Sequence, residues 1–249
     1  MIPLHDDNPT RITPFVTIAV IGACVLVFLW QISLPPGHAE AAFYAYGVVP
    51  AVLFGEVSLP PEIHVLPPAL TVVSSMFLHG GWMHLIGNMA YLWIFGNNIE
   101  DAMGHGRFVL FYVLCGVAAA LAQALAAPGS EIPMIGASGA ISGVLGAYLL
   151  LYPRARVLTL LTLGFFFYFV RIRAAWVLGF WIVLQVFNAA IAPADAGGVA
   201  WLAHVGGFGA GVLLIGPFKY RHVAFFGRAR PPPPPPRSPR RGRRRGPWG

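Results

Sequence analysis

Six long apolar runs determine what this chain can fold into. A helix of about 17 to 25 mostly apolar residues is long enough to cross the hydrocarbon core of a bilayer. Hydrophobic residues make up 57% of the chain and charged residues 10%, well below the ~25% charge of a typical soluble domain. These features predict an all-α polytopic membrane protein, a bundle of six transmembrane helices. The predicted spans are residues 14–33, 83–103, 107–127, 136–152, 174–192 and 199–217.

Residues 157–170 form a further apolar segment, which is shorter than a span. Arg154 and Arg156 precede it, and Arg171 and Arg173 follow it. A segment of this length suits a piece that lies in the interface or re-enters the membrane better than a helix that crosses it. We therefore expect an interfacial or re-entrant element between the fourth and fifth spans.

The basic residues indicate how the spans are oriented, because Lys and Arg accumulate in the cytoplasmic connections of membrane proteins. With an inside N-terminus and six spans, all 16 Lys and Arg residues lie on the inner side. The outer connections, at about 34–82, 128–135 and 193–198, hold none. A seventh span at 157–170 would place the arginine-rich C-terminus outside. We therefore predict a multi-pass integral membrane protein with cytoplasmic N- and C-termini.

The N-terminal sequence predicts which membrane holds the protein. The chain begins with a short, polar and acidic segment that lacks the basic n-region of a cleaved signal peptide. No organelle transit peptide is evident either, so the first apolar run is expected to be a retained anchor. The predicted location is the bacterial inner (plasma) membrane, with an archaeal membrane as the alternative.

The first outer connection, residues 34–82, is long and contains three Pro-Pro pairs. It also carries aromatic residues, among them Phe43, Tyr44 and Phe54. Long loops without structure of their own are uncommon, and the apolar content favours contact with the membrane surface. We expect a long, ordered and interfacial first outer loop.

The last residues, 223–249, differ in composition from the rest, so we divide the chain into a membrane domain at 1–222 and a Pro/Arg-rich cytoplasmic tail at 223–249. Pro231 to Pro236 favour extended polyproline helix, and the arginines after them cannot form a core. The tail is predicted to be disordered and to contact anionic lipid, at about 1 kcal/mol per basic residue near the surface. Nucleic-acid binding is not expected, because no recognition fold accompanies the charge.

Ser138 and His204 are polar residues inside apolar runs, where a buried polar group is costly and therefore a candidate for function. Ser138 begins the fourth span, and His204 lies near the start of the sixth, which runs in the same direction. At ~1.5 Å per residue, both lie within roughly 10 Å of the outer membrane boundary. A serine hydroxyl needs a base to become a nucleophile, and a neutral imidazole can supply it. Because no carboxylate lies at matching depth, we predict a Ser-His dyad rather than a triad.

His84 and Asn88 are spaced i, i+4 in the second span and share one helix face. That span also begins outside, so both side chains reach the depth of Ser138. Their N–H groups, with the backbone N–H of Ser138, are expected to stabilise the oxyanion of a tetrahedral intermediate. His79, near the start of the same helix, is expected to make a structural hydrogen bond that holds the outer loop.

Small residues lie just below the two candidate catalytic residues. Gly139 and Gly143 form a GxxxG pair after the serine, and Gly207 and Gly211 form another after the histidine. Such pairs let two helices approach backbone to backbone. We expect the fourth and sixth helices to pack closely and to bring the serine and the histidine together.

These motifs together resemble those of the rhomboid family of intramembrane serine proteases. The resemblance rests on HGGWMHLIGNMAYLWIFGNNIED at 79–101, GASGAISGVLGAY at 136–148 and AHVGGFGAG at 203–211. It covers about residues 14–217 and leaves out the tail. It implies a six-helix rhomboid-like bundle.

The resemblance also implies a role for each candidate residue. Ser138 would be the nucleophile and His204 the general base, while His84 and Asn88 would stabilise the oxyanion. The implied activity is that of a serine endopeptidase, which cuts single-pass membrane proteins in or near their transmembrane segment, at sites rich in small residues, through an acyl-enzyme. Neither a cofactor nor a metal is implied.

The chain departs from the family pattern at two places. Some members carry a tyrosine four residues after the serine, where it stacks on the histidine, and this chain has Ser142 there. His204 must then be oriented in another way, by Trp201 or by helix packing. The tryptophan-arginine pair of the first outer loop in some members is also missing, because residues 34–82 contain no arginine.

Three other functions compete with a serine protease. A non-catalytic rhomboid-like protein that binds membrane clients is the main alternative, although such proteins usually lack the serine or the histidine. A transporter or channel predicts internal repeats and midplane charges, and neither is visible in the sequence. A metal-dependent protease with His79, His84 and His204 as ligands would lack both an HExxH motif and a carboxylate ligand.

Overall fold

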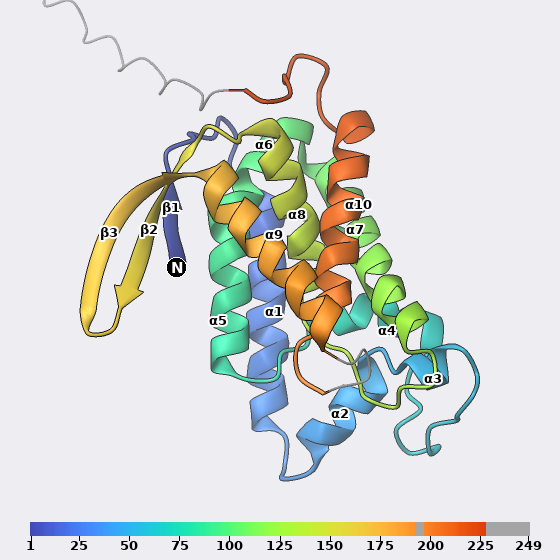
Figure 1. Cartoon of the computed structure of the whole chain (residues 1–249). Coiled ribbons are helices and arrows are strands. Elements are labelled where there is room, and N and C mark those ends of the chain that lie inside the picture. Colours follow the sequence, from blue (N-terminus) through green and yellow to red (C-terminus); the bar gives the residue numbers. More distant parts are fainter. Residues whose placement is uncertain (193–196, 228–249) are drawn as a thin grey trace, which may run out of the picture.

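The computed structural model describes residues 1–192 and 197–227. Helices occupy all six ranges predicted as spans, and their ends lie close to the predicted ones. Figure 1 shows these helices side by side as a bundle. They are α1 (Phe15–Ser33), the continuous helix of α5 (Trp82–Tyr91), η2 (Leu92–Gly96) and α6 (Asn97–Met103), then α7 (His105–Ala126), α8 (Ser138–Leu151), α9 (Ala174–Ile191) and α10 (Trp201–Phe218).

Four helices, α1, α7, α9 and α10, are long and apolar enough to cross a membrane. The helix from Trp82 to Met103 passes the same test together with Pro68–Phe77, from which it is bent by 83°. α8 is apolar but has only 14 residues. The described residues therefore form a multi-pass helical membrane protein with four or five candidate spans and the shorter α8.

α8 lies in the interior of the bundle, in contact with α7, α9 and α10. Every residue from Gly139 to Tyr148 is buried. Neighbouring helices therefore cover α8 along most of its length, although it is shorter than a span. The element that begins with Ser138 is thus held mainly by other helices of the bundle.

Glycines bring α8 and α10 into backbone contact. A Cβ atom added to Gly207 would overlap the carbonyl oxygen of Gly139, and one added to Gly211 would overlap that of Gly143. Any larger side chain at either α10 position would push the two helices apart. The close packing predicted from the two GxxxG pairs is confirmed.

The helix from Trp82 to Met103 is not a regular α-helix throughout. Its middle segment, η2, is π-helical. A π turn accommodates one residue more than an α turn, and such turns inside α-helices often lie near functional sites. Before this turn the helix carries His84 and Asn88, and after it Asn98 and Glu100.

The structure corrects the all-α prediction. Residues 157–170, expected as an interfacial or re-entrant piece, form a β-hairpin of β2 (Arg156–Leu163) and β3 (Phe166–Arg173). β1 (Ile2–Asp6) pairs with β2, which gives an antiparallel sheet of order β1-β2-β3 beside the bundle (Figure 1). Gly164 makes the turn with a φ of +62°. The segment is rich in aromatic and β-branched residues and too short to span, so strand pairing satisfies its backbone instead.

The long first connection is ordered, as predicted. It contains α2 (His38–Tyr46), α3 (Pro50–Leu53), α4 (Pro68–Ser74) and the 3-10 turn η1 (Ser75–Phe77). α3 and α4 each begin with a proline, which suits the first turn of a helix because an N–H there has no partner to lose. These short helices gather at the end of the bundle opposite to the C-terminus of α10 (Figure 1).

A buried carboxylate caps the start of α1. Glu100 accepts hydrogen bonds from the backbone N–H groups of Val16 and Thr17 at 2.9 and 2.8 Å, and from the Thr17 hydroxyl at 2.7 Å. Oε1 of Glu100 also lies 2.6 Å from Nδ1 of His105. The first N–H groups of a helix have no partner within it, so Glu100 satisfies α1 from another helix.

A second buried carboxyl group ties β1 to the central helix. Asp6 accepts a hydrogen bond from the hydroxyl of Tyr148 on α8 and another, at 3.0 Å, from the side-chain amide of Asn98. Burial raises the pKa of Asp6 to about 6, and the hydrogen bond from Tyr148 acts against this rise. The charge of this group therefore changes within a moderate pH range.

The described chain continues past α10 to Gly227. The N–H groups of Phe226 and Gly227 donate to the carbonyl oxygens of Leu150 and Leu151 at 2.8 and 2.9 Å. Residues 223–227, assigned to the tail in the sequence-based division, therefore contact the end of α8. The remainder of the predicted tail lies outside the described residues, as do the outer residues 193–196.

Candidate active site

Ser138 is the first residue of α8, and a glycine with positive φ leads into the helix. Gly136 has a φ of +118°, and its N–H donates to the carbonyl oxygen of Ser75 at 2.9 Å. A Cβ atom there would lie only 2.7 Å from Nε2 of His84. Because the first N–H groups of a helix have no partner within it, this loop presents Ser138 with unpaired backbone donors beside His84.

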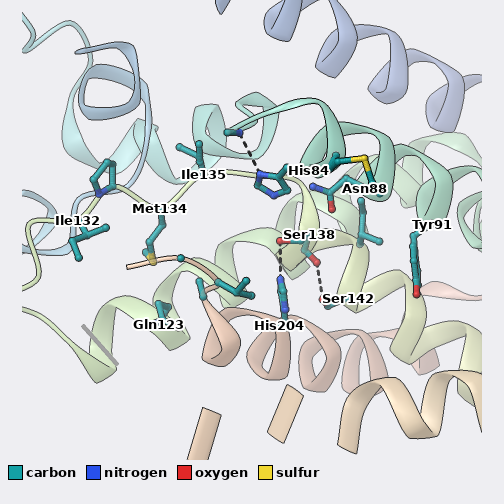
Figure 2. Close-up of a pocket in the computed structure, with 18 of the residues that line it drawn as sticks. His84, Asn88, Tyr91, Gln123, Ile132, Met134, Ile135, Ser138, Ser142 and His204 are labelled. Atoms are coloured by element: carbon teal, nitrogen blue, oxygen red, sulfur yellow. Dashed lines mark hydrogen bonds between the residues drawn. The ribbon is translucent and has the colours of Figure 1, made fainter. Parts of the chain in front are cut away.

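The side chains of Ser138 and His204 meet. Oγ of Ser138 lies 2.8 Å from Nε2 of His204, as the dashed line in Figure 2 shows. His204 lies in the first turn of α10, and the glycine contacts between α8 and α10 set the distance between the two backbones. At this separation the imidazole can accept the proton of the serine hydroxyl.

The other nitrogen of the imidazole is held by α9, a contact not predicted from the sequence. Oε1 of Gln185 lies 2.8 Å from Nδ1 of His204. Trp181 and Trp201 flank the ring, with ring centroids 5.8 and 6.3 Å from it. Trp201 or helix packing was expected to orient the ring, and Trp181 and Gln185 were missed. The signal available was an amide one helical turn after a tryptophan, inside the apolar run 174–192.

Ser142 stands where some relatives have a tyrosine. Its hydroxyl is buried and donates to the carbonyl oxygen of Ser138 at 2.6 Å, within α8. Ser142 therefore supports the backbone of its own helix. The orientation of the His204 ring comes from α9 and α10 instead.

His84 and Asn88 line the same cavity as Ser138, from the α5 side (Figure 2). The N–H of Gly80 donates to Nδ1 of His84 at 3.3 Å, so in the neutral ring the hydrogen is on Nε2, which faces the Gly136 loop. The amide nitrogen of Asn88 is buried, with no hydrogen-bond partner among the residues that the structure describes. Two unused donors therefore lie beside the serine.

All four candidate residues line one cavity, which has a volume of about 680 Å³. It is lined by residues of α5, α8, α9 and α10 and of the connections that precede α8 and α10. Its wall is mostly apolar, with contributions from Met83, Tyr91, Met134, Ile135, Ile141, Leu145 and Trp181. Apolar walls with a few convergent polar groups are typical of a ligand-binding site.

Backbone groups of His79 tie the long first connection to α1. Its backbone N–H donates to Oε1 of Gln31 at 3.1 Å, and the amide of Gln31 donates to its carbonyl oxygen at 3.3 Å. Burial lowers the pKa of His79 to about 4, so the ring is neutral at pH 7. The ring packs edge-on against His84, with centroids 5.1 Å apart, and thereby supports the wall of the cavity.

A hydroxyl, an imidazole that can take its proton and two free donors around one cavity are the parts that acyl transfer requires. Within the described ranges, no three His, Cys, Asp or Glu side chains are grouped as metal ligands. The structure therefore gives the metal-dependent alternative no support.

Residues 68–221 match the family model of the Rhomboid domain. The matched range covers more than half of the chain. It includes α5 to α10 and all four candidate residues, together with Gln185. It leaves out α1 and β1.

Several curated proteins are similar to the chain. "Rhomboid protein 1, mitochondrial" of Saccharomyces cerevisiae is 32% identical over 148 residues, which are 58% of this chain and 40% of that protein. "Rhomboid-like protein 11, chloroplastic" of Arabidopsis thaliana is 28% identical over 165 residues, 61% of this chain and 53% of that protein. "Rhomboid protease GluP" of Bacillus subtilis is 38% identical over 93 residues, 37% of this chain and 18% of that protein. The chain thus spans about half or less of the length of these relatives.

Proposed function

This chain belongs to the rhomboid family, and we propose that it is a serine endopeptidase that cuts peptide bonds within the membrane. The hydrogen bond of 2.8 Å between Oγ of Ser138 and Nε2 of His204 carries the proposal. The pair lies in a mostly apolar cavity among the helices of a membrane protein, where polar groups are rare unless they serve a function. The printed name of a similar Bacillus subtilis protein, a rhomboid protease, supports the same activity.

In the proposed reaction, Oγ of Ser138 attacks the carbonyl carbon of the scissile bond while Nε2 of His204 takes the hydroxyl proton. The imidazolium then protonates the leaving amine, and an ester to the serine remains. His204 next removes a proton from water, which hydrolyses this ester and restores the free serine.

The negative charge of the tetrahedral intermediates is proposed to fall between α5 and the start of α8. Nε2–H of His84, the amide of Asn88 and the backbone N–H of Ser138 point to this region. Donors placed in advance where charge develops stabilise a transition state without reorganising. The unpartnered amide nitrogen of Asn88 supports this assignment, because a buried donor is rarely left without an acceptor.

The proposal is tested with Ser138→Ala and His204→Ala in reconstituted membranes that contain a single-span reporter protein. Either substitution is expected to lower cleavage by on the order of 10⁶-fold, to background, because nucleophile and base act as a unit. Ser33→Ala, at the exposed end of α1, and His64→Ala, at an exposed position of the first connection, are the matched controls and should cleave normally. Undiminished cleavage by Ser138→Ala would refute the mechanism. A wild-type protein that binds the reporter without cutting it would instead support the client-binding alternative.

We further propose six spans, with both termini in the cytoplasm of a bacterium and the cavity towards the outer face. The absence of Lys and Arg from the outer connections supports this orientation. At residue 228, a reporter enzyme that works only in the cytoplasm should be active. At residue 132, a reporter enzyme that works only after export should be active. An exported signal from residue 228 would overturn the orientation.

The proposed substrates are single-pass membrane proteins, cut in or near their spans at sites rich in small residues. The location of the cavity within the helical bundle supports a substrate that arrives through the bilayer. Incubation of candidate single-pass proteins with wild-type and Ser138→Ala enzyme, followed by mass spectrometry of the fragments, tests this. Fragments that form equally with both proteins would exclude a candidate.

A further inference from the structure

We propose that Gln185 is a positioning residue for His204, and that its amide oxygen holds the imidazole in the one tautomer that can deprotonate Ser138. This inference rests on the proposed function. It assigns to α9, which supplies neither the serine nor the histidine, a part in the chemistry that is exerted through His204.

The two nitrogens of His204 have different partners. Nδ1 lies 2.8 Å from Oε1 of Gln185, and Nε2 lies 2.8 Å from Oγ of Ser138. An amide oxygen can only accept a hydrogen bond, so Nδ1 must carry a hydrogen. A neutral imidazole has a single N–H, and Nε2 is therefore left with the lone pair that faces the serine hydroxyl. The opposite tautomer would set an N–H against that hydroxyl and could not accept its proton.

The orientation of the Gln185 amide is itself determined by α9. Its Nε2 donates to the carbonyl oxygen of Trp181, one turn earlier, at 3.2 Å. A flipped amide would set its oxygen against this carbonyl oxygen and its NH₂ group against Nδ1 of His204. Because the carbonyl oxygen can only accept, the flip would lose the hydrogen bond to Trp181. The helix thus fixes which end of the amide the histidine meets.

The burial of Gln185 is unusual for its helix. α9 has four buried residues, and three of them, Ala174, Val177 and Leu178, lie near its start. Beyond Gly179, Gln185 is the single buried side chain of this fully described helix, and its exposed fraction is 6%. Burying an amide costs free energy unless its groups are hydrogen-bonded, and here the oxygen and the nitrogen each have a partner.

In a catalytic triad, the third residue holds the imidazole in the correct tautomer and orientation. The amide of Gln185 can do the same without bringing a charge into the membrane. A carboxylate in this place would have to be desolvated, at a cost of several times that of a neutral amide. The amide still fixes the tautomer, and the wrong tautomer is what makes loss of the third residue costly in serine proteases. Ser142, one turn after Ser138, donates its hydroxyl to the carbonyl oxygen of Ser138 and takes no part in holding the imidazole.

The test compares Gln185→Met with Asn188→Met. Methionine resembles glutamine in length and flexibility but offers Nδ1–H no oxygen acceptor. Asn188 lies one turn further along α9 and makes the same bond back to its own helix, to the carbonyl oxygen of Leu184 at 2.8 Å. We expect Gln185→Met to lower kcat about 10²-fold with little change in KM, because general-base catalysis is typically worth at least this much. Asn188→Met should leave kcat unchanged.

Gln185→Glu separates positioning from packing. It retains an acceptor for Nδ1–H and should restore most of the kcat lost in Gln185→Met. A carboxylate beside Nδ1 also favours the protonated imidazole, so the acid limb of the pH–rate profile should move to higher pH. If Gln185 served packing alone, Gln185→Glu would neither restore kcat nor shift the acid limb of the pH–rate profile. If Gln185→Met does not fold, Gln185→Asn, whose amide is one methylene shorter, is expected to show the same loss of kcat.

A second measurement does not depend on cleavage. The ¹⁵N chemical shifts of labelled histidine, assigned to His204 by difference from His204→Ala, should report hydrogen on Nδ1 in the wild type and a mixture of tautomers in Gln185→Met. Wild-type kcat together with an unchanged tautomer in Gln185→Met would overturn the inference. A wild-type chain that cleaves nothing would refute the proposed function, while the tautomer would still test the role of Gln185.

Discussion

Two neighbours of α10 contact it in different ways beside the candidate site. Towards α8, the contact is made by backbone, at Gly207 and Gly211, where no side chain intervenes. Towards α9, it depends on side chains, above all on Gln185. The first contact sets how far Ser138 is from His204, and the second sets which way the imidazole faces. Glycines, which have no side chain, can thus set the distance between two candidate catalytic groups. The orientation of one of these groups requires a side chain that contacts it.

The largest effect is expected where the backbone contact is blocked. Gly211→Leu places a side chain where the carbonyl oxygen of Gly143 lies, so α8 and α10 cannot keep their distance. Overpacking of a core commonly costs about 1–3 kcal/mol, and here backbone rather than a flexible side chain must move, so we expect at least the upper end. Cleavage should fall to background together with the thermal unfolding midpoint in detergent.

Gly209→Leu is the matched control for this prediction, because nothing lies within 4 Å of a Cβ atom at Gly209. It should retain both activity and stability. Equal damage from Gly209→Leu and Gly211→Leu would mean that helix flexibility, and not close approach, is what these glycines provide.

A smaller effect is expected on α5, which contributes to the site through side chains, as α9 does. Asn88→Ala removes a donor that has no other partner and should lower kcat about 10²- to 10³-fold, as for a single oxyanion donor in other proteases. The unfolding midpoint should change little, since no described hydrogen bond of this amide nitrogen is lost. Ile86→Ala, at an exposed position on the same helix, is the control. An Asn88→Ala variant with normal kcat but raised KM would assign Asn88 to substrate binding instead.

The smallest effect is expected at Asp6 and concerns stability. Asp6 lies on β1 and contacts α8 at Tyr148, ten residues after the serine. The pKa of Asp6 is raised to about 6 from an ordinary value of 3.8, so the folded state binds the proton more tightly than the unfolded state. This contribution is fully present below pH ~4 and is lost as the pH rises through about 6, by up to about 3 kcal/mol.

Asp6→Asn should therefore flatten the fall in unfolding midpoint between pH 4 and pH 7.5 in detergent. Asp7→Asn, at the exposed neighbouring position, should leave the fall in place. If the wild-type midpoint does not fall over this range, then Asp6 keeps its charge at a smaller cost than its burial indicates.

Much of the helical part could be predicted, because a membrane helix is recognised from a local run of apolar residues. The contact between Ser138 and His204 could also be predicted, since the GxxxG pair that follows each of them is a local signal of close packing. The i, i+4 spacing likewise places His84 and Asn88 on one face. In the structure all four line one cavity, and their catalytic roles stay proposals.

What was missed depends on contacts between segments distant in the sequence. β1 pairs with a strand about 150 residues later, and no pattern in the five residues of β1 indicates this partner. Gln185 could be recognised as a polar residue in an apolar run, but whether it faces lipid or His204 depends on the rotation of α9 about its own axis. That rotation is set by tertiary packing, which a single sequence does not reveal.

The π turn of η2 has a consequence for how the second span can be altered. Because the π turn absorbs one extra residue, everything after it lies about 100° behind the position it would take in a regular α-helix of the same sequence. Asn88 faces the cavity before the turn, and Glu100 faces the start of α1 after it. The two ends are therefore in phase with their separate partners only while these five residues keep the π-helical turn. Deleting one residue between 92 and 96 would let this turn become α-helical and keep both ends in phase, whereas substitutions that made all five residues regular α-helix would turn either the cavity face or the capping carboxylate away from its partner.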